Sequence, residues 1–103
     1  MEKIPYKPRK HILVCTNERT EGKACCFNVK GMDIYRELKD FVRLNGFASL
    51  VWVTKTGCLG FCNNIGTTVV IYPDGLWFKE VTIEDLDSIK RIMIAQKPQV
   101  FEA

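Results

Sequence analysis

Two cysteines lie four residues apart in the segment Thr56-Gly57-Cys58-Leu59-Gly60-Phe61-Cys62. A helical turn through this segment would place both thiols on one face, because residues four apart are neighbours on a helix. Three more cysteines stand upstream, at Cys15, Cys25 and Cys26. Four thiolates complete a tetrahedral zinc site or an iron–sulfur site, so a fold that brings these cysteines together would create a metal centre.

The chain before this segment predicts two parallel strands joined by a helix. Residues 47–55 contain the apolar run Leu50-Val51-Trp52-Val53, which predicts a central strand covered on both faces. Residues 11–16 predict a buried strand with Cys15 near its C-terminal end. Between them, residues 31–45 carry apolar side chains at helical spacing. Such a helix is the crossover that parallel strands need, so both cysteine-bearing segments are expected at the same edge of the sheet.

A hairpin and a second helix are predicted after the segment. Residues 67–72 and 76–81 are rich in β-branched and aromatic side chains and flank the turn sequence Pro73-Asp74-Gly75. Thr82 is a typical helix N-cap, and the helix is expected over residues 83–96. Its buried face is expected to hold Ile83, Leu86, Ile89, Ile92 and Met93. The element order predicts an α/β fold with a mixed four-stranded sheet, two parallel strands plus a C-terminal hairpin, covered by helices.

The composition indicates one small domain. Of the 103 residues, 47% are hydrophobic, which is enough for a core that does not depend wholly on a metal or on disulfides. We expect a polar arm at residues 1–9, a folded domain at residues 10–97 and a tail at residues 98–103. Fifteen Lys and Arg against 12 Asp and Glu leave a net charge of +3, which is too small to support nucleic-acid binding.

No targeting or membrane segment is expected in this sequence. The first ten residues hold four Lys or Arg and two Pro but no apolar run, unlike a signal peptide. No apolar stretch is long enough to cross a bilayer. We therefore expect a soluble, cytoplasmic protein. In a reducing cytosol its five cysteines are more typical of metal ligands or reactive thiols than of structural disulfides.

The lone histidine, His11, is not expected to bind a metal together with Cys15. His11 begins the first predicted strand about 13 Å from Cys15, too far to share a metal with it, so we expect a surface or hydrogen-bonded side chain.

Adjacent cysteines rarely both bind one small centre, so one of Cys25 and Cys26 is expected not to be a ligand. The spacing alone matches neither the C-x2-C zinc pattern nor the common ferredoxin runs, and it favours an iron–sulfur cluster only modestly over zinc.

Four motifs follow one another in this chain. They are His11-Ile12-Leu13-Val14-Cys15-Thr16-Asn17, a loop ending in cysteine before a Gly-led helix, the segment 56–62, and Val69-Val70-Ile71-Tyr72-Pro73-Asp74-Gly75-Leu76-Trp77-Phe78. Their order resembles the thioredoxin-like [2Fe–2S] ferredoxins of the Shethna-protein type. It is more distantly similar to the small cluster-bearing subunit of respiratory complex I and of related hydrogenases. The resemblance spans about residues 10–96, nearly the whole chain.

This resemblance implies a thioredoxin-like sheet that lacks the first strand–helix unit, with one [2Fe–2S] cluster on four cysteines in two loops. By position the ligands are Cys15, Cys26, Cys58 and Cys62, with Cys25 as the alternative to Cys26. Gly57 and Gly60 would let backbone amides approach the sulfurs closely. The resemblance also implies a homodimer, formed partly through the sheet edge or the cluster-side surface.

The sequence leaves three candidate functions open. The leading one is a one-electron carrier that serves a reductase or oxidoreductase partner and is not itself an enzyme. The sequence has no phosphate loop and no Ser-His-Asp set, so no substrate site is evident. The second is an enzyme, a thiol–disulfide oxidoreductase using Cys58 and Cys62. That chemistry normally uses C-x-x-C spacing, and it would leave Cys15 without a role. The third is a structural zinc-binding module on the same thiols.

Overall fold

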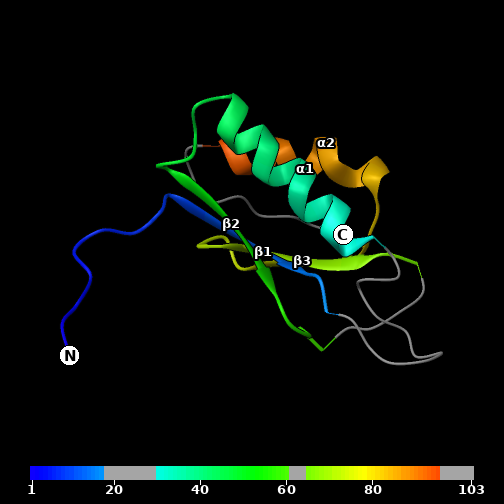
Figure 1. Cartoon of the computed structure of the whole chain (residues 1–103), viewed down its shortest axis with the longest axis horizontal. Helices are drawn as coiled ribbons and strands as arrows, with labels where there is room; N and C mark the ends of the chain where they lie inside the picture. The colour runs from blue at the N-terminus through cyan, green and yellow to red at the C-terminus, as the bar shows by residue number, and fades with distance from the viewer. Residues whose placement is uncertain (18–29, 61–64, 96–103) are drawn as a thin grey trace.

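The chain folds as one four-stranded sheet with both helices on the same face (Figure 1). This structure is a computed structural model that describes residues 1–17, 30–60 and 65–95. The strands are β1 (Lys10–Cys15), β2 (Val51–Thr56), β3 (Thr67–Tyr72) and β4 (Leu76–Val81), in the spatial order β2-β1-β3-β4. β1 and β2 are parallel, β3 is antiparallel to β1, and β4 is antiparallel to β3. The predicted mixed α/β sheet is confirmed.

Helix α1 (Gly31–Leu44) is the crossover between the two parallel strands. Its apolar residues Ile34, Leu38 and Val42 recur every four positions, and all three are buried against the sheet. At the C-terminal end, the Asn45 side-chain amide donates to the Phe41 carbonyl at 2.8 Å. The helix ends at the predicted stop, where the backbone N–H of Asn45 also donates to the Phe41 carbonyl, at 3.2 Å.

The core lies between the sheet and the two helices. The strands contribute Ile12, Val14, Val51, Val53, Val69, Ile71 and Val81, and the helices contribute Ile34, Leu38, Val42, Leu86, Ile89 and Met93. Each fully buried side chain of this kind stabilises the fold by about 1.5–3 kcal/mol. Alternate residues of a strand point to opposite faces. Neither of the described helices, α1 and α2, lies over the other face of the sheet (Figure 1).

Strand β2 lies at an edge of the described sheet, which corrects the prediction of a central strand covered on both faces. β1 takes the central place because it pairs with β2 on one side and β3 on the other. Trp52, on the face away from the helices, is 38% exposed. The strand also starts later than predicted, because residues 48–50 form a turn in which the Leu50 N–H donates to the Phe47 carbonyl at 2.9 Å.

The second predicted helix begins with one 3-10 turn, η1 (Ile83–Asp85), and continues as α2 (Leu86–Ile94). Thr82 is the N-cap as predicted, and its backbone N–H donates to the Asp85 carboxylate at 2.9 Å. Leu86, Ile89 and Met93 are buried, and Ile92 is partly buried. Ile83 was wrongly placed on this face: it is 53% exposed, because the tighter turn rotates it off the 3.6-residue stripe. The predicted end at Gln96 lies outside the described residues.

The N-terminal segment extends from this fold. Residues 1–7 are exposed, contain neither helix nor strand, and extend away from the sheet in Figure 1. The predicted tail at 98–103 lies outside the described residues. Among the helices that the structure describes, none is long and apolar enough to cross a membrane.

Candidate metal centre

The C-terminal ends of β1 and β2 bring the two cysteine-bearing segments together. The parallel register pairs Cys15 with Thr56, two residues before Cys58. Just beyond the strands, the Thr16 N–H donates to the Thr56 carbonyl at 3.1 Å. Cys15 and Cys58 therefore lie at the same end of the sheet, where β1 and β2 end, as predicted from the parallel pairing.

The segment around Cys58 is irregular. Residues 57–60 contain neither helix nor strand, and Gly60 has a φ of 95°, which a right-handed helical turn does not allow. The Gly60 N–H donates to Sγ of Cys58 at 3.3 Å. The predicted helical turn is therefore wrong for these residues, since the positive φ breaks it. The expected approach of a backbone amide to a sulfur is confirmed at Gly60.

The segment after β1 lies close to this one. A Cβ added at Gly57 would lie 4.0 Å from Oδ1 of Asn17, which follows β1. The chain after β1 and the chain after β2 are thus adjacent at the level of Gly57. A centre held between Cys15 and Cys58 would be enclosed by these two segments.

The two described thiols have different environments. Cys15 is 1% exposed, whereas Cys58 is exposed. The Cys15 backbone is further held by Thr67 at the start of β3, whose hydroxyl donates to the Cys15 carbonyl at 2.6 Å. Sequence reasoning missed Thr67, because its partner is 52 positions away and no local pattern indicates the contact. A centre on these thiols would have one side within the protein and one side near the surface.

The remaining predicted ligands, Cys25, Cys26 and Cys62, lie outside the described residues. Over residues 1–17, 30–60 and 65–95, no three His, Cys, Asp or Glu side chains are grouped to bind a metal. The described part of the site thus brings together two predicted donors, Cys15 and Cys58. Two thiols at one sheet edge, one of them accepting a backbone N–H bond, fit the thiolate chemistry of an iron–sulfur or zinc centre.

The histidine lies elsewhere on the sheet. Nε2 of His11 is 2.8 Å from Oγ1 of Thr54, and its ring packs edge-on against Trp52 with centroids 6.0 Å apart. The prediction of a hydrogen-bonded surface histidine is confirmed.

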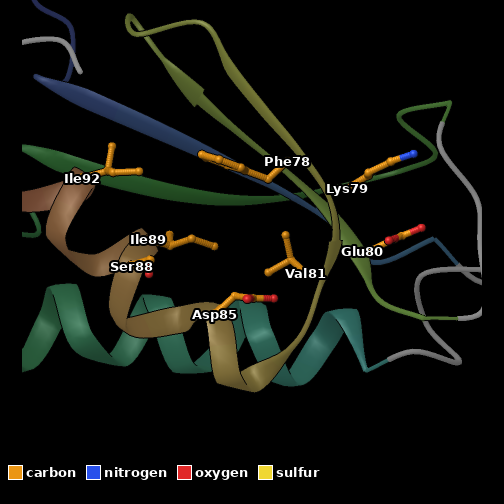
Figure 2. Close-up of a pocket in the computed structure, with 8 residues that line it drawn as sticks. All are labelled: Phe78, Lys79, Glu80, Val81, Asp85, Ser88, Ile89 and Ile92. Carbon is orange, nitrogen blue, oxygen red and sulfur yellow. The ribbon is translucent and has the colours of Figure 1, made fainter. Parts of the chain in front are cut away.

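A cavity of about 300 Å³ lies between β4 and α2 (Figure 2). Val81 and Ile89 extend into the space between the strand and the helix, whereas Lys79 and Glu80 point away from it. None of the eight residues that line it is a cysteine or a histidine. The described lining of the cavity therefore includes neither Cys15 nor Cys58.

Comparison with known proteins identifies the family. Over 84 residues the chain is 36% identical to "Ferredoxin, 2Fe-2S" of Clostridium pasteurianum, a match that covers 80% of this chain and 81% of that protein. The chain belongs to the [2Fe–2S] ferredoxins. A second ferredoxin of the same description, from Aquifex aeolicus, is 32% identical over 84 residues, covering 78% of this chain and 74% of that one. No protein-family model matches the chain.

Solved structures place this ferredoxin in the thioredoxin-like group. It matches the thioredoxin-like [2Fe–2S] ferredoxin of Aquifex aeolicus with a TM-score of 0.72 at 27% identity, over 84% of this chain and 85% of that chain. Another structure of a thioredoxin-like [2Fe–2S] ferredoxin from that organism gives 0.71 at 26% identity, over 92% and 100%. Two further structures are variants with serine in place of one cysteine, at positions four apart, the spacing of Cys58 and Cys62 here. The predicted thioredoxin-like fold is confirmed.

Proposed function

We propose that this chain binds one [2Fe–2S] cluster and carries single electrons between redox proteins in the cytoplasm. The observation that carries the proposal is the meeting of Cys15 and Cys58 at one edge of the sheet, in a chain of the ferredoxin family. Its partners are a reductase or oxidoreductase that exchanges electrons with it. It acts as a carrier and not as an enzyme with a substrate of its own.

The cluster ligands that we assign are Cys15, Cys26, Cys58 and Cys62, with Cys25 as the alternative to Cys26. Cys15 ends β1, and Cys58 follows the end of the adjacent parallel strand β2. The two loops that begin there can therefore share one cluster. When bound, the cluster accepts and returns one electron, which adds negative charge to a centre that is already anionic.

The protein's own groups tune that exchange. The Gly60 N–H, 3.3 Å from the Cys58 sulfur, stabilises negative charge on that ligand. The burial of Cys15 limits the access of water to its side of the centre. Both effects act on the reduction potential, the first by a hydrogen bond to sulfur and the second through solvent exposure.

The other two functions are less favoured. A thiol–disulfide oxidoreductase would use Cys58 and Cys62 alone, and a zinc module would use the same four thiols without redox chemistry. The relatives that match this chain are named as ferredoxins, which supports the carrier over both.

A homodimer is the proposed assembly, through the sheet face that carries neither of the described helices, here called the open face. Its side chains include His11, Leu13, Trp52, Tyr72 and Trp77. The register places Trp52, His11 and Tyr72 in one row across three strands. Trp52, Tyr72 and Trp77 are 38%, 42% and 49% exposed. Aromatic side chains gathered on an exposed face are typical of protein–protein interfaces, and a two-fold axis lets one face serve both subunits.

Anaerobic purification tests the function. We expect coloured protein with iron and acid-labile sulfide in equal amounts, and an electron paramagnetic resonance signal that appears after one-electron reduction. Colourless protein that holds zinc would support the structural module. Metal-free protein with a titratable Cys58–Cys62 disulfide would support the oxidoreductase, and either result would overturn the carrier.

A further inference from the structure

Thr67 is buried directly beside the Cys15 backbone. Its hydroxyl donates to the Cys15 carbonyl at 2.6 Å, and the two residues are 0% and 1% exposed. A distance of 2.6 Å is at the short end for a hydroxyl donor. Thr67 comes from the antiparallel strand β3, so this contact joins the end of β1 to an element that carries no cysteine in the described residues.

A close backbone contact holds Thr67 in place. Its neighbour Gly66 packs so tightly on β4 that an added Cβ would lie 2.4 Å from the Glu80 carbonyl carbon and 2.4 Å from the Val81 carbonyl oxygen. Thr67 itself pairs with Val81, and the register of the two strands shifts between Thr67 and Val69. The start of β3 is therefore fixed by main chain, which side-chain motion cannot relax.

The β4 backbone is strained at the same point. Glu80 has a φ of 58°, a left-handed conformation that non-glycine residues rarely adopt. In Figure 2 Glu80 points away from the cavity while the adjacent Val81 points into it. Val81, which follows Glu80, is buried in the core, and the backbone of both residues lies against Gly66. Such strain persists where the surrounding structure holds it in place.

Cys15 is consequently held from two sides. On the β2 side, the chain after Cys15 is tied by the Thr16 N–H to the Thr56 carbonyl at 3.1 Å. On the β3 side, the Thr67 hydroxyl holds the Cys15 carbonyl. A valine would fill the same volume as threonine in a strand, and a buried hydroxyl costs free energy unless it is hydrogen-bonded. The hydroxyl of Thr67 therefore serves its contact with Cys15 and adds nothing to packing.

We propose that Thr67 is a positioning residue for the cluster. The Thr67 hydroxyl fixes the Cys15 peptide and, through it, the Cys15 sulfur. The inference rests on the proposed function, in which Cys15 is a ligand. Release of this peptide lets the end of β1 move and admits water beside the cluster. Water favours the more negatively charged, reduced state, so loss of the hydroxyl raises the reduction potential.

The test compares holoproteins that carry Thr67→Val, Thr67→Ser and the control Thr54→Val. We expect Thr67→Val to increase the equilibrium constant for one-electron reduction about tenfold, which is about 59 mV, and to change the g-values of the reduced cluster. Thr67→Ser keeps the hydroxyl and is expected to retain the wild-type potential. Thr54→Val removes a threonine hydroxyl that bonds His11 on the open face, and it should leave both readouts unchanged.

The results separate this proposal from the proposed function. Wild-type protein without iron and sulfide would contradict the function itself. A wild-type cluster whose potential is unchanged by Thr67→Val, or shifted equally by Thr67→Ser, would overturn the positioning role. If Thr67→Val does not fold, Thr67→Ala is compared with Thr67→Ser, and equal potentials overturn the role. Loss of folding in both the valine and alanine variants would make the hydroxyl a requirement of the fold, which also overturns it.

Discussion

The ammonium of Lys10 lies 2.7 Å from Oδ1 and 2.6 Å from Oδ2 of Asp74, and the two side chains are 1% and 0% exposed. Lys10 is the first residue of β1 and Asp74 lies in the turn between β3 and β4, so the pair joins the sheet at the end opposite to Cys15. Breaking a buried pair leaves an uncompensated charge in the interior, which costs more than the pair itself contributes.

Asp74→Asn is therefore expected to lower the free energy of unfolding by about 3–5 kcal/mol, because it leaves the Lys10 ammonium buried beside a neutral amide. Urea unfolding followed by circular dichroism measures the change. The matched control is Asp40→Asn, which removes an ion pair with Arg43 whose side chains are 57% and 67% exposed. That control should cost less than about 1 kcal/mol. Equal losses in the two variants would contradict a stabilising buried pair.

Gly66→Ala is expected to destabilise the protein by about 3 kcal/mol, because the new Cβ would lie 2.4 Å from backbone atoms of Glu80 and Val81. Backbone cannot move aside as a flexible side chain can. In Gly57→Ala the new Cβ would meet no described atom closer than 4.0 Å, so this control should change stability by less than about 1 kcal/mol. The comparison uses urea unfolding of both proteins at equal iron content. A Gly66→Ala protein as stable as the control would show that β4 can shift.

The cysteine doublet gives a prediction about cluster content. Cys26→Ala is expected to lose most of its iron and sulfide, because three thiolates leave one iron without its fourth ligand. Cys25→Ala is expected to keep a full cluster, since adjacent residues rarely both bind one small centre. Iron, sulfide and visible absorption per chain are the measurements. Retention in Cys26→Ala together with loss in Cys25→Ala would reverse the assignment.

Trp77→Lys should weaken the proposed dimer about thirtyfold, the equivalent of about 2 kcal/mol for loss of an aromatic anchor in an interface. Sedimentation equilibrium at several concentrations measures the dissociation constant. Leu44→Lys is the matched control, because Leu44 is also an exposed apolar residue, 72% exposed, but ends α1 and lies off the open face. Equal association of the two variants, or a monomeric wild type, would count against the open face as the interface.

Local sequence pattern determined most elements of this protein and the shared end of the sheet at which Cys15 and Cys58 lie. The four-residue spacing of Ile34, Leu38 and Val42 predicts α1, and the turn Pro73-Asp74-Gly75 predicts the hairpin. Both are short-range effects, since a helix and a tight turn form their hydrogen bonds within a few residues. A helix between two strands is the crossover that a parallel pair needs, so it favoured the parallel pairing that the structure has. The meeting of Cys15 and Cys58 at one edge therefore followed from sequence alone.

Tertiary structure alone decided which strand is central, how the chain turns at Gly60, and what holds Cys15. The apolar run around Trp52 predicts a covered strand, but β1 took the central place and left Trp52 exposed. The Thr67 hydroxyl reaches a carbonyl 52 positions away. Hydrophobic periodicity records which face of an element is apolar, but it does not record which element lies beside it. Contacts between residues distant in sequence are chosen by the packing of the whole fold, and the environment of Cys15, a proposed cluster ligand, depends on such a contact.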